Sequence, residues 1–146
     1  MFNSIVVGTD GSETAEKAVG QAMELAKVHG ATLHVVTAFQ PVSSEGFQSS
    51  RGVPAEFSSS ASPRDAVDAL LGEIAHLATE AAIPFETYAR MGDPADALLD
   101  VAEERDADLI VVGNKGMTGA KRFLLGSVQN KVSHHAPCSV LIIRTT

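Results

Sequence analysis

The stretch LIVVGNKGMTGAKRFLLGSV, residues 109–128, decides the fold of this chain. It opens with the apolar run LIVV, whose length and β-branched content are typical of a buried strand. Gly113 and Gly116 then interrupt the pattern, and glycine lets the backbone approach a ligand closely because it has no Cβ. Ser127 precedes apolar residues at every fourth position, which predicts a helix with this serine at its N-cap. A helix N-terminus offers unpaired N–H groups and a partial positive charge, which suit a phosphate group.

Charge also sets this stretch apart from the rest of the chain. All eighteen acidic residues lie at or before Asp108, together with six of the eleven basic residues. The five remaining basic residues are Lys115, Lys121, Arg122, Lys131 and Arg144. An acidic protein that keeps its carboxylates away from a glycine-rich loop is typical of one that receives an anion there. The alternative is a glycine-tolerant loop beside an ordinary solvated basic surface.

At these residues the chain resembles the universal stress protein family, which are small α/β nucleotide-binding proteins. The signature of that family is glycine, two residues, glycine, nine residues, then glycine followed by serine or threonine. Gly113, Gly116, Gly126 and Ser127 have this spacing. The segments LLGSV and HAPC, the closing apolar run VLII and the early segment IVVGTDGS also resemble the family, so the resemblance covers essentially the whole chain. One departure is Lys115, because many members have histidine there.

Alternating strand and helix patterns predict an α/β protein with a parallel sheet that is covered by helices on both faces. We expect strands at 5–7, 33–39, 84–91, 109–112 and 139–144. Helices are expected to begin at Ser12, Ser62, Asp93 and Ser127, whose side chains suit N-caps. The second helix is expected to bury a stripe formed by Val67, Leu70, Ile74, Leu77 and Ala81. The family resemblance implies an open, Rossmann-like five-stranded sheet in the order 3-2-1-4-5.

Two segments share the pattern IVVGxxG, at residues 5–11 and 110–116. Ligands of open α/β sheets bind outside the carboxyl ends of strands, where the strand order reverses. In the family's strand order the first and fourth strands are neighbours at that point, so both glycine turns would line one crevice. The alternative is coincidence between two buried strands that both prefer isoleucine and valine.

The whole chain of 146 residues is expected to form a single domain, 1–146. Residues 40–62, rich in serine, glycine and proline, are expected to form a mobile loop. A net charge of −7 argues against nucleic-acid partners and against anionic membrane surfaces. The chain has no apolar run long enough for a membrane span and no signal-peptide pattern, so we expect it to be cytoplasmic.

Motifs for several enzyme classes are absent from the sequence. There is no GxGxxG after a strand, no GxxxxGK[ST] and no GxSxG, and Cys138 is the only cysteine. We therefore predict no catalytic residues, no metal ligands and no enzyme activity. Slow ATP hydrolysis could accompany binding, although no positioned general base is evident.

The resemblance and the glycine signature together imply binding of an adenine nucleotide, either ATP or cAMP, with Mg²⁺ as a companion of ATP. The residues expected to bind the nucleotide are Gly8, Thr9, Asp10, Ala38, Gly113, Lys115, Gly116, Met117, Gly126, Ser127 and Val128. Gly8, Thr9 and Asp10 would face the nucleoside, Ala38 would border the base, and the last three would contact phosphates. The carboxylate of Asp10 could instead serve only turn or cap chemistry.

The apolar strand at 140–143 is the last element in the predicted alternation of strands and helices. In the family's strand order it lies at a sheet edge. An exposed apolar edge favours pairing with a second copy, so we expect a homodimer with an antiparallel contact. The rival hypothesis for function is an interaction protein of the same fold that dimerises through this strand and binds no nucleotide.

Overall fold

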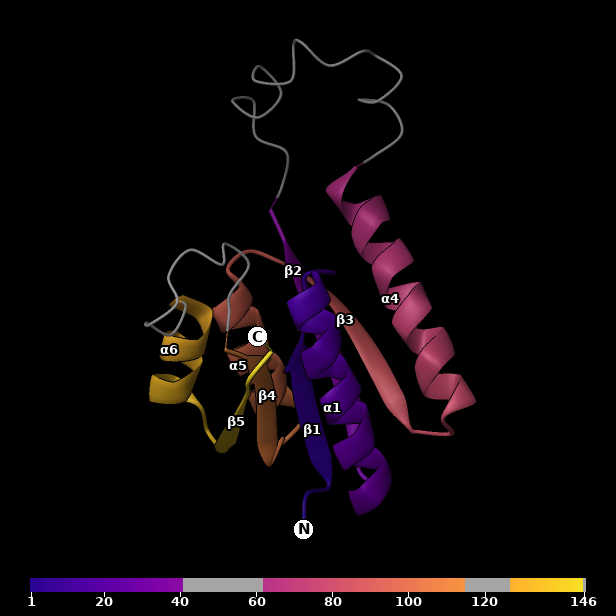
Figure 1. Ribbon diagram of the computed structural model, residues 1–146. Coiled ribbons are helices and arrows are strands. Elements are labelled where there is room, and N and C mark those ends of the chain that lie inside the picture. Colours follow the sequence, from indigo (N-terminus) through magenta and orange to yellow (C-terminus); the bar gives the residue numbers. More distant parts are fainter. Residues whose placement is uncertain (41–61, 115–126, 146) are drawn as a thin grey trace, which may run out of the picture.

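The computed structural model describes residues 1–40, 62–114 and 127–145 (Figure 1). In chain order the elements are β1 (Ser4–Gly8), α1 (Glu13–His29), β2 (Thr32–Phe39), α4 (Pro63–Glu80), β3 (Phe85–Met91), α5 (Pro94–Glu104), β4 (Leu109–Gly113), α6 (Ser127–His135) and β5 (Ser139–Ile143). The loop predicted at 40–62 lies outside the described residues except at its two ends.

The five strands form one sheet in the order β3-β2-β1-β4-β5, and every pairing is parallel. This confirms the predicted fold class and strand order. The central pair is β1 and β4, with Ile5 opposite Leu109 and Val7 opposite Val111. The chain runs outward from β1 through β2 to β3, then returns to the other side of β1 as β4. The strand order therefore reverses between β1 and β4.

Helices cover both faces of this sheet (Figure 1), with α1 and α4 on one face and α5 and α6 on the other. Alternate residues of β1 point to opposite faces, so Ile5 and Val7 pack with α1 while Val6 packs with α5. All three are fully buried. Burial on both sides explains why the central strands have continuous runs of valine and isoleucine instead of an alternating pattern.

Local capping positions three of the helix starts as predicted. The side chains of Ser12, Ser62 and Asp93 accept hydrogen bonds from backbone N–H groups three residues further on, at 3.2, 3.0 and 3.0 Å. These bonds satisfy N–H groups that the helix itself leaves unpaired. The structure describes α6 from Ser127 onward, and the residue before it lies outside the described ranges.

The buried stripe of α4 differs from the predicted one. Val67, Leu71, Ile74 and Ala78 are the residues that α4 buries, whereas Leu77 is 52% exposed. Both sets have spacings of three and four residues, as one helix face requires, and they share Val67 and Ile74. The neighbouring Leu70 is half-buried at the margin of the same cluster.

Candidate functional site

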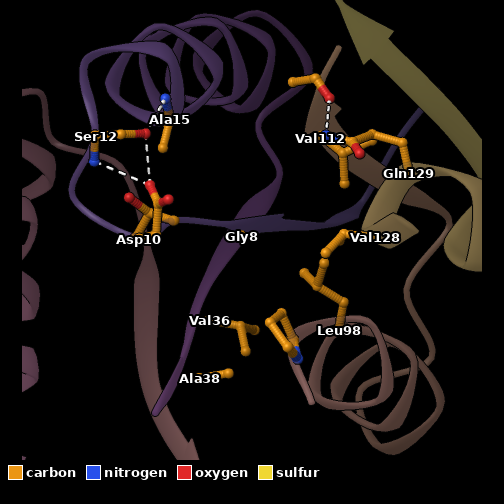
Figure 2. Close-up of a pocket in the computed structure, with 13 residues that line it drawn as sticks. Gly8, Asp10, Ser12, Ala15, Val36, Ala38, Leu98, Val112, Val128 and Gln129 are labelled. Carbon is orange, nitrogen blue, oxygen red and sulfur yellow. Dashed lines mark hydrogen bonds between the residues drawn. The ribbon is translucent and has the colours of Figure 1, made fainter. Parts of the chain in front are cut away.

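A pocket lies where the carboxyl ends of β1, β2 and β4 meet, beside the point at which the strand order reverses (Figure 2). It contains about 590 Å³ of empty space, part of which is open to solvent. The residues that line it are Gly8, Thr9, Asp10, Ser12, Ala15, Val36, Ala38, Pro94, Leu98, Val112, Gly113, Val128 and Gln129. They come from strand ends and from the N-terminal turns of α1, α5 and α6.

One part of the pocket is apolar. Val36 and Ala38 from β2 lie near Leu98 from α5 on one side of the cavity (Figure 2). The glycine at position 8 keeps this part open, because a Cβ there would lie 3.1 Å from both terminal methyl groups of Leu98. An apolar wall of this kind suits a flat, poorly hydrated group such as a base.

The turn after β1 is held by several hydrogen bonds. The backbone N–H of Thr9 donates to the carbonyl oxygen of Val36 at 3.0 Å, and the hydroxyl of Thr37 donates to the carbonyl oxygen of Thr9. The hydroxyl oxygen of Thr9 accepts from the N–H of Gly11 at 3.1 Å. Gly11 has a φ of +83°, a conformation that glycine adopts without steric cost. This bonding fixes the direction in which Asp10 projects.

The carboxylate of Asp10 has one engaged oxygen and one free oxygen. Its Oδ1 accepts from the backbone N–H of Ser12 at 2.9 Å and from the Ser12 hydroxyl at 2.6 Å (Figure 2). Its Oδ2 has no hydrogen-bond partner among the described residues. Oδ1 of Asp10 therefore has the turn role that the sequence analysis left open. Oδ2 remains able to accept a hydrogen bond from a ligand.

Gln129 forms the opposite side of the pocket. Its side chain reaches from α6 towards the end of β4 (Figure 2), and its Nε2 donates to the carbonyl oxygen of Gly113 at 2.6 Å. Gln129 is only 3% exposed. Its Oε1 is a buried acceptor with no partner in the described part of the chain. This bond links the first turn of α6 to the strand end that carries the glycine signature.

Three helix N-termini point towards the pocket, but they differ in charge. The first turn of α1 contains Glu13 and Glu16, and that of α5 contains Asp96. The first turn of α6 contains no acidic residue. A nearby carboxylate neutralises the partial positive charge of a helix N-terminus, so α6 is the helix whose N-terminus keeps its attraction for an anion.

Lys131 on α6 is paired with the start of α5. Its Nζ lies 2.7 Å from Asp96 Oδ1 and 3.5 Å from Asp93 Oδ2. The hydrogen bond to Asp96 is the main cause that raises the pKa of Lys131 above its ordinary value. All three side chains are more than two-fifths exposed, so this contact contributes little to the free energy of unfolding. It does place α6 beside α5 along one margin of the pocket.

The structure brings together about half of the residues predicted for the site. The pocket is lined by Gly8, Thr9, Asp10, Ala38, Gly113 and Val128. Ser127 is exposed and is not among the lining residues. The predicted residues Lys115, Gly116, Met117 and Gly126 lie outside the described ranges.

Sequence reasoning missed the lining residues Ser12, Ala15, Val36, Pro94, Leu98, Val112 and Gln129. Most of these are apolar residues whose role follows only from the packing of helices on the sheet. Gln129 did carry a signal, because it lies three residues before the fully buried Val132 and therefore shares its helix face. A glutamine on a buried face needs a polar partner.

Two features are absent from the parts of the chain that the structure describes. Within 1–40, 62–114 and 127–145, no three histidine, cysteine, aspartate or glutamate side chains gather closely enough to hold a metal ion. The helices in those ranges include none with the length and apolar character to cross a membrane.

Comparison with known proteins identifies the family. The model of the universal stress protein family matches residues 1–144. Universal stress protein YxiE of Bacillus subtilis is 34% identical over 148 aligned residues, covering 99% of this chain and 100% of the relative. A crystal structure of a universal stress protein in complex with cAMP is 34% identical, with a TM-score of 0.73 and coverage of 99% of this chain and 98% of that one.

A third relative supports the fold alone. The universal stress protein of Archaeoglobus fulgidus in complex with dAMP is 22% identical, with a TM-score of 0.65 and coverage of 97% of this chain and 98% of that one. The family match over nearly the whole length agrees with the strand order, the pocket at the switch point and the glycine signature. The chain belongs to the universal stress protein family.

Proposed function

We propose that this protein binds an adenine nucleotide, ATP or cAMP, in the pocket at the switch point and serves as a regulatory binding protein. The observation that carries the proposal is the pocket itself, which joins an apolar wall to an acid-free helix N-terminus. One universal stress protein of known structure, which is 34% identical over 99% of this chain, was crystallised in complex with cAMP. A shared family and a similar fold make the same class of ligand the best-supported one here.

The two parts of the pocket suit the two parts of a nucleotide. The base would lie against Val36, Ala38 and Leu98, where burial removes apolar surface from water. The phosphates would lie at the start of α6, where backbone N–H groups are unpaired. Gly126 of the glycine signature is expected to contribute there, together with Lys115, which stands just before the second signature glycine.

Asp10 would then face the sugar or the metal that accompanies ATP. It is the one carboxylate among the described residues that line the pocket. Its Oδ2 could accept a hydrogen bond from a ribose hydroxyl in either ligand. With ATP, the same oxygen could serve as one ligand of a Mg²⁺ ion held mainly by phosphates and water.

Binding without turnover is part of the proposal. Among the described lining residues, Asp10 is the sole ionisable side chain, and its Oδ1 is already committed to Ser12. Hydrolysis of ATP needs a group that orients and activates the attacking water. We therefore expect the nucleotide to act as a signal and not as a substrate.

A homodimer formed through β5 is the second part of the proposal. This strand is a sheet edge, and its Leu141 and Ile142 are each 36% exposed. The same observation favours the rival function, an interaction protein of this fold that binds no nucleotide. The two functions differ in one measurable property, which is the binding of nucleotide.

Calorimetric titration with ATP, ADP, AMP and cAMP tests the proposal directly. At least one of the four should bind saturably. Ala38→Leu would extend a larger side chain into the apolar part of the pocket and should weaken binding by about tenfold or more. The matched control is Ala66→Leu on the exposed surface of α4, which should leave the affinity unchanged. No heat from any of the four at millimolar concentration would refute nucleotide binding and favour the rival.

A further inference from the structure

The segment after β5 crosses the carboxyl end of β4 and reaches α1. In Figure 1 the chain leaves β5 and passes over the end of β4 towards the first turns of α1. Residues beyond the last strand of a domain are usually poorly ordered unless contacts tie them down. Thr145 in this segment is only 3% exposed. Specific contacts on both sides of Thr145 account for its burial.

Asn114 supplies the contact on the β4 side. Its side chain lies 2.8 Å from the backbone nitrogen of Thr145 and 2.9 Å from the Thr145 hydroxyl. A backbone N–H can only donate, so the amide atom that faces Thr145 is the acceptor Oδ1. The backbone N–H of Asn114 donates to the carbonyl oxygen of Ile143 at 2.8 Å. The segment after β5 therefore holds Asn114 through both its backbone and its side chain.

Lys17 supplies the contact on the α1 side, where its Nζ donates to the carbonyl oxygen of Thr145 at 3.1 Å. Lys17 is two residues beyond Ala15, which lines the pocket. Asn114 directly follows Gly113, which also lines the pocket. Thr145 thus links the two elements that carry these two lining residues.

This link bears on how firmly the pocket is built. The hydrophobic core joins α1 to the sheet below the pocket, where Ala18 and Val19 are buried. At the strand end itself, Thr145 adds a polar link between α1 and β4. A ligand that must first order a mobile wall loses affinity, because the ordering costs conformational entropy. A wall that is already held avoids this cost.

We propose that Thr145 is a positioning residue for nucleotide binding, whose bridge between Asn114 and Lys17 holds the end of β4 and the start of α1 as the bound nucleotide requires. Thr145 does not line the pocket and acts through Gly113 and Ala15. This inference rests on the proposed function, because it needs a nucleotide in the pocket. By linkage, the nucleotide stabilises the segment after β5 to the same extent as the bridge strengthens binding.

Removing a single hydroxyl tests the inference. Thr145→Val keeps the shape of the side chain and the backbone N–H but loses the hydroxyl bond to Asn114, whereas Thr145→Ser keeps a hydroxyl. Calorimetry is performed with whichever of ATP, ADP, AMP and cAMP the wild type binds most tightly. Thr145→Val should bind this nucleotide about three- to tenfold more weakly, and Thr145→Ser should remain within about twofold of the wild type.

Ser62→Ala is the matched control for a general loss of stability. The Ser62 hydroxyl accepts from the backbone N–H of Asp65 at the start of α4, and Ser62 does not line the pocket. Losing this cap lowers the free energy of unfolding. Because calorimetry reports on folded protein, which thermal melting verifies for each variant, Ser62→Ala should bind the nucleotide as the wild type does.

Lys17→Met tests the other end of the bridge, since it removes the donor to the Thr145 carbonyl. It also removes a positive charge, so the exposed Lys27→Met on the same helix is the charge control. Lys17→Met should weaken binding more than Lys27→Met does. Combined with Thr145→Val, it should weaken binding by less than the product of the two single effects, because both break one bridge.

Hydrogen exchange gives the reciprocal measurement. Added nucleotide should slow exchange in the C-terminal peptide of the wild type, and should slow it less in Thr145→Val. Wild-type affinity in Thr145→Val, equal weakening in Thr145→Ser, or equal weakening in Ser62→Ala would overturn the role of Thr145 and leave the proposed function intact. Failure of the wild type to bind any of the four nucleotides would instead remove the proposed function, and this inference with it.

Discussion

A histidine buried within the sheet links two neighbouring strands through its side chain. His34 on β2 is 5% exposed, and its Nδ1 lies 2.9 Å from the hydroxyl of Tyr88 on β3. The Tyr88 hydroxyl donates its one proton to Glu86 at 2.6 Å, so the hydrogen of the first bond belongs to His34. Arg105 pairs with the same carboxylate at 3.3 Å. The contacts therefore run from His34 through the Tyr88 hydroxyl to the Glu86 carboxylate, which Arg105 also pairs.

The environment shifts the pKa values of this group in consistent directions. Burial lowers the pKa of His34, because the charged imidazolium is poorly solvated there. Burial, together with the hydrogen bond to Glu86, raises the pKa of Tyr88 to about 12. The hydrogen bond from Tyr88 is the main cause that lowers the pKa of Glu86. His34 and Tyr88 are thus held neutral and Glu86 charged.

We predict that His34 makes the protein lose stability in mild acid. Its folded-state pKa is below the ordinary value of 6.5, so the unfolded chain takes up a proton first as the pH falls. The free energy of unfolding should therefore decrease from the neutral range through pH 6.5 and below. His34→Gln cannot titrate and should show a shallower decrease, measured by urea unfolding between about pH 7.5 and about pH 5. Parallel curves for the two proteins would show that His34 is not responsible.

Individual elements show which parts of the fold can be predicted from sequence. Helix starts at Ser12, Ser62 and Asp93 were predicted correctly because capping is local and involves residues three apart. The α4 stripe was correct at Val67 and Ile74 and wrong at Leu77, because the exact limits of a buried helix face depend on how the helix packs on the sheet. The contacts of His34 and Gln129 depend on which residues of other elements pack beside them, and no local sequence pattern predicts such contacts.

The residues of the site also divide into those that a local sequence pattern predicts and those that depend on how helices pack on the sheet. Residues at the carboxyl ends of strands were predictable, since a glycine after an apolar run marks both the strand end and the ligand turn. Gly8 and Gly113 are of this kind, and both line the pocket. Residues that reach the pocket from helices, such as Leu98, required the packing of α5 on the sheet. No local spacing in the sequence relates Leu98 to Gly8.

The segment after β5 is held by the residue that follows β4. Oδ1 of Asn114 accepts hydrogen bonds from the backbone N–H and the hydroxyl of Thr145, at 2.8 and 2.9 Å. The backbone N–H of Asn114 also donates to the carbonyl oxygen of Ile143 at 2.8 Å. On the other side, Lys17 of α1 donates to the carbonyl oxygen of Thr145 at 3.1 Å. Thr145 is consequently 3% exposed.

We predict that Asn114→Ala destabilises the protein and releases this segment. Two buried donors of Thr145 would lose their shared acceptor, which costs roughly 1–3 kcal/mol of the free energy of unfolding. Asn114→Asp keeps an acceptor oxygen at the same place and should retain most of the stability. Urea unfolding measures the loss of stability, and hydrogen exchange of the C-terminal peptide measures the release of the segment. Equal protection of that peptide in the alanine variant and the wild type would contradict the role of Asn114.

At the scale of the whole molecule, the two edges of the sheet differ in chemistry. The β3 edge carries Glu86 and Arg90, both in ion pairs with residues of or near α5. The β5 edge reads SVLII and carries no charge, and none of its residues is buried. Charged residues on an edge strand discourage pairing with another chain, whereas an uncharged apolar edge favours it. Self-association should therefore use β5 and spare β3.

The last prediction is that the protein is a homodimer and that substitutions on β5 dissociate it. Light scattering at tens of micromolar should give twice the 15.2 kDa mass of one chain. Leu141→Glu combined with Ile142→Glu adds like charges that would face each other across a two-fold contact, so this variant should have the mass of one chain. Both side chains are partly exposed, so the fold should persist, as circular dichroism can verify. Met91→Glu is the matched control, because Met91 is 65% exposed at the end of the opposite edge and should leave the dimer intact. A wild-type mass of one chain, or dissociation by the Met91 variant alone, would contradict assembly through β5.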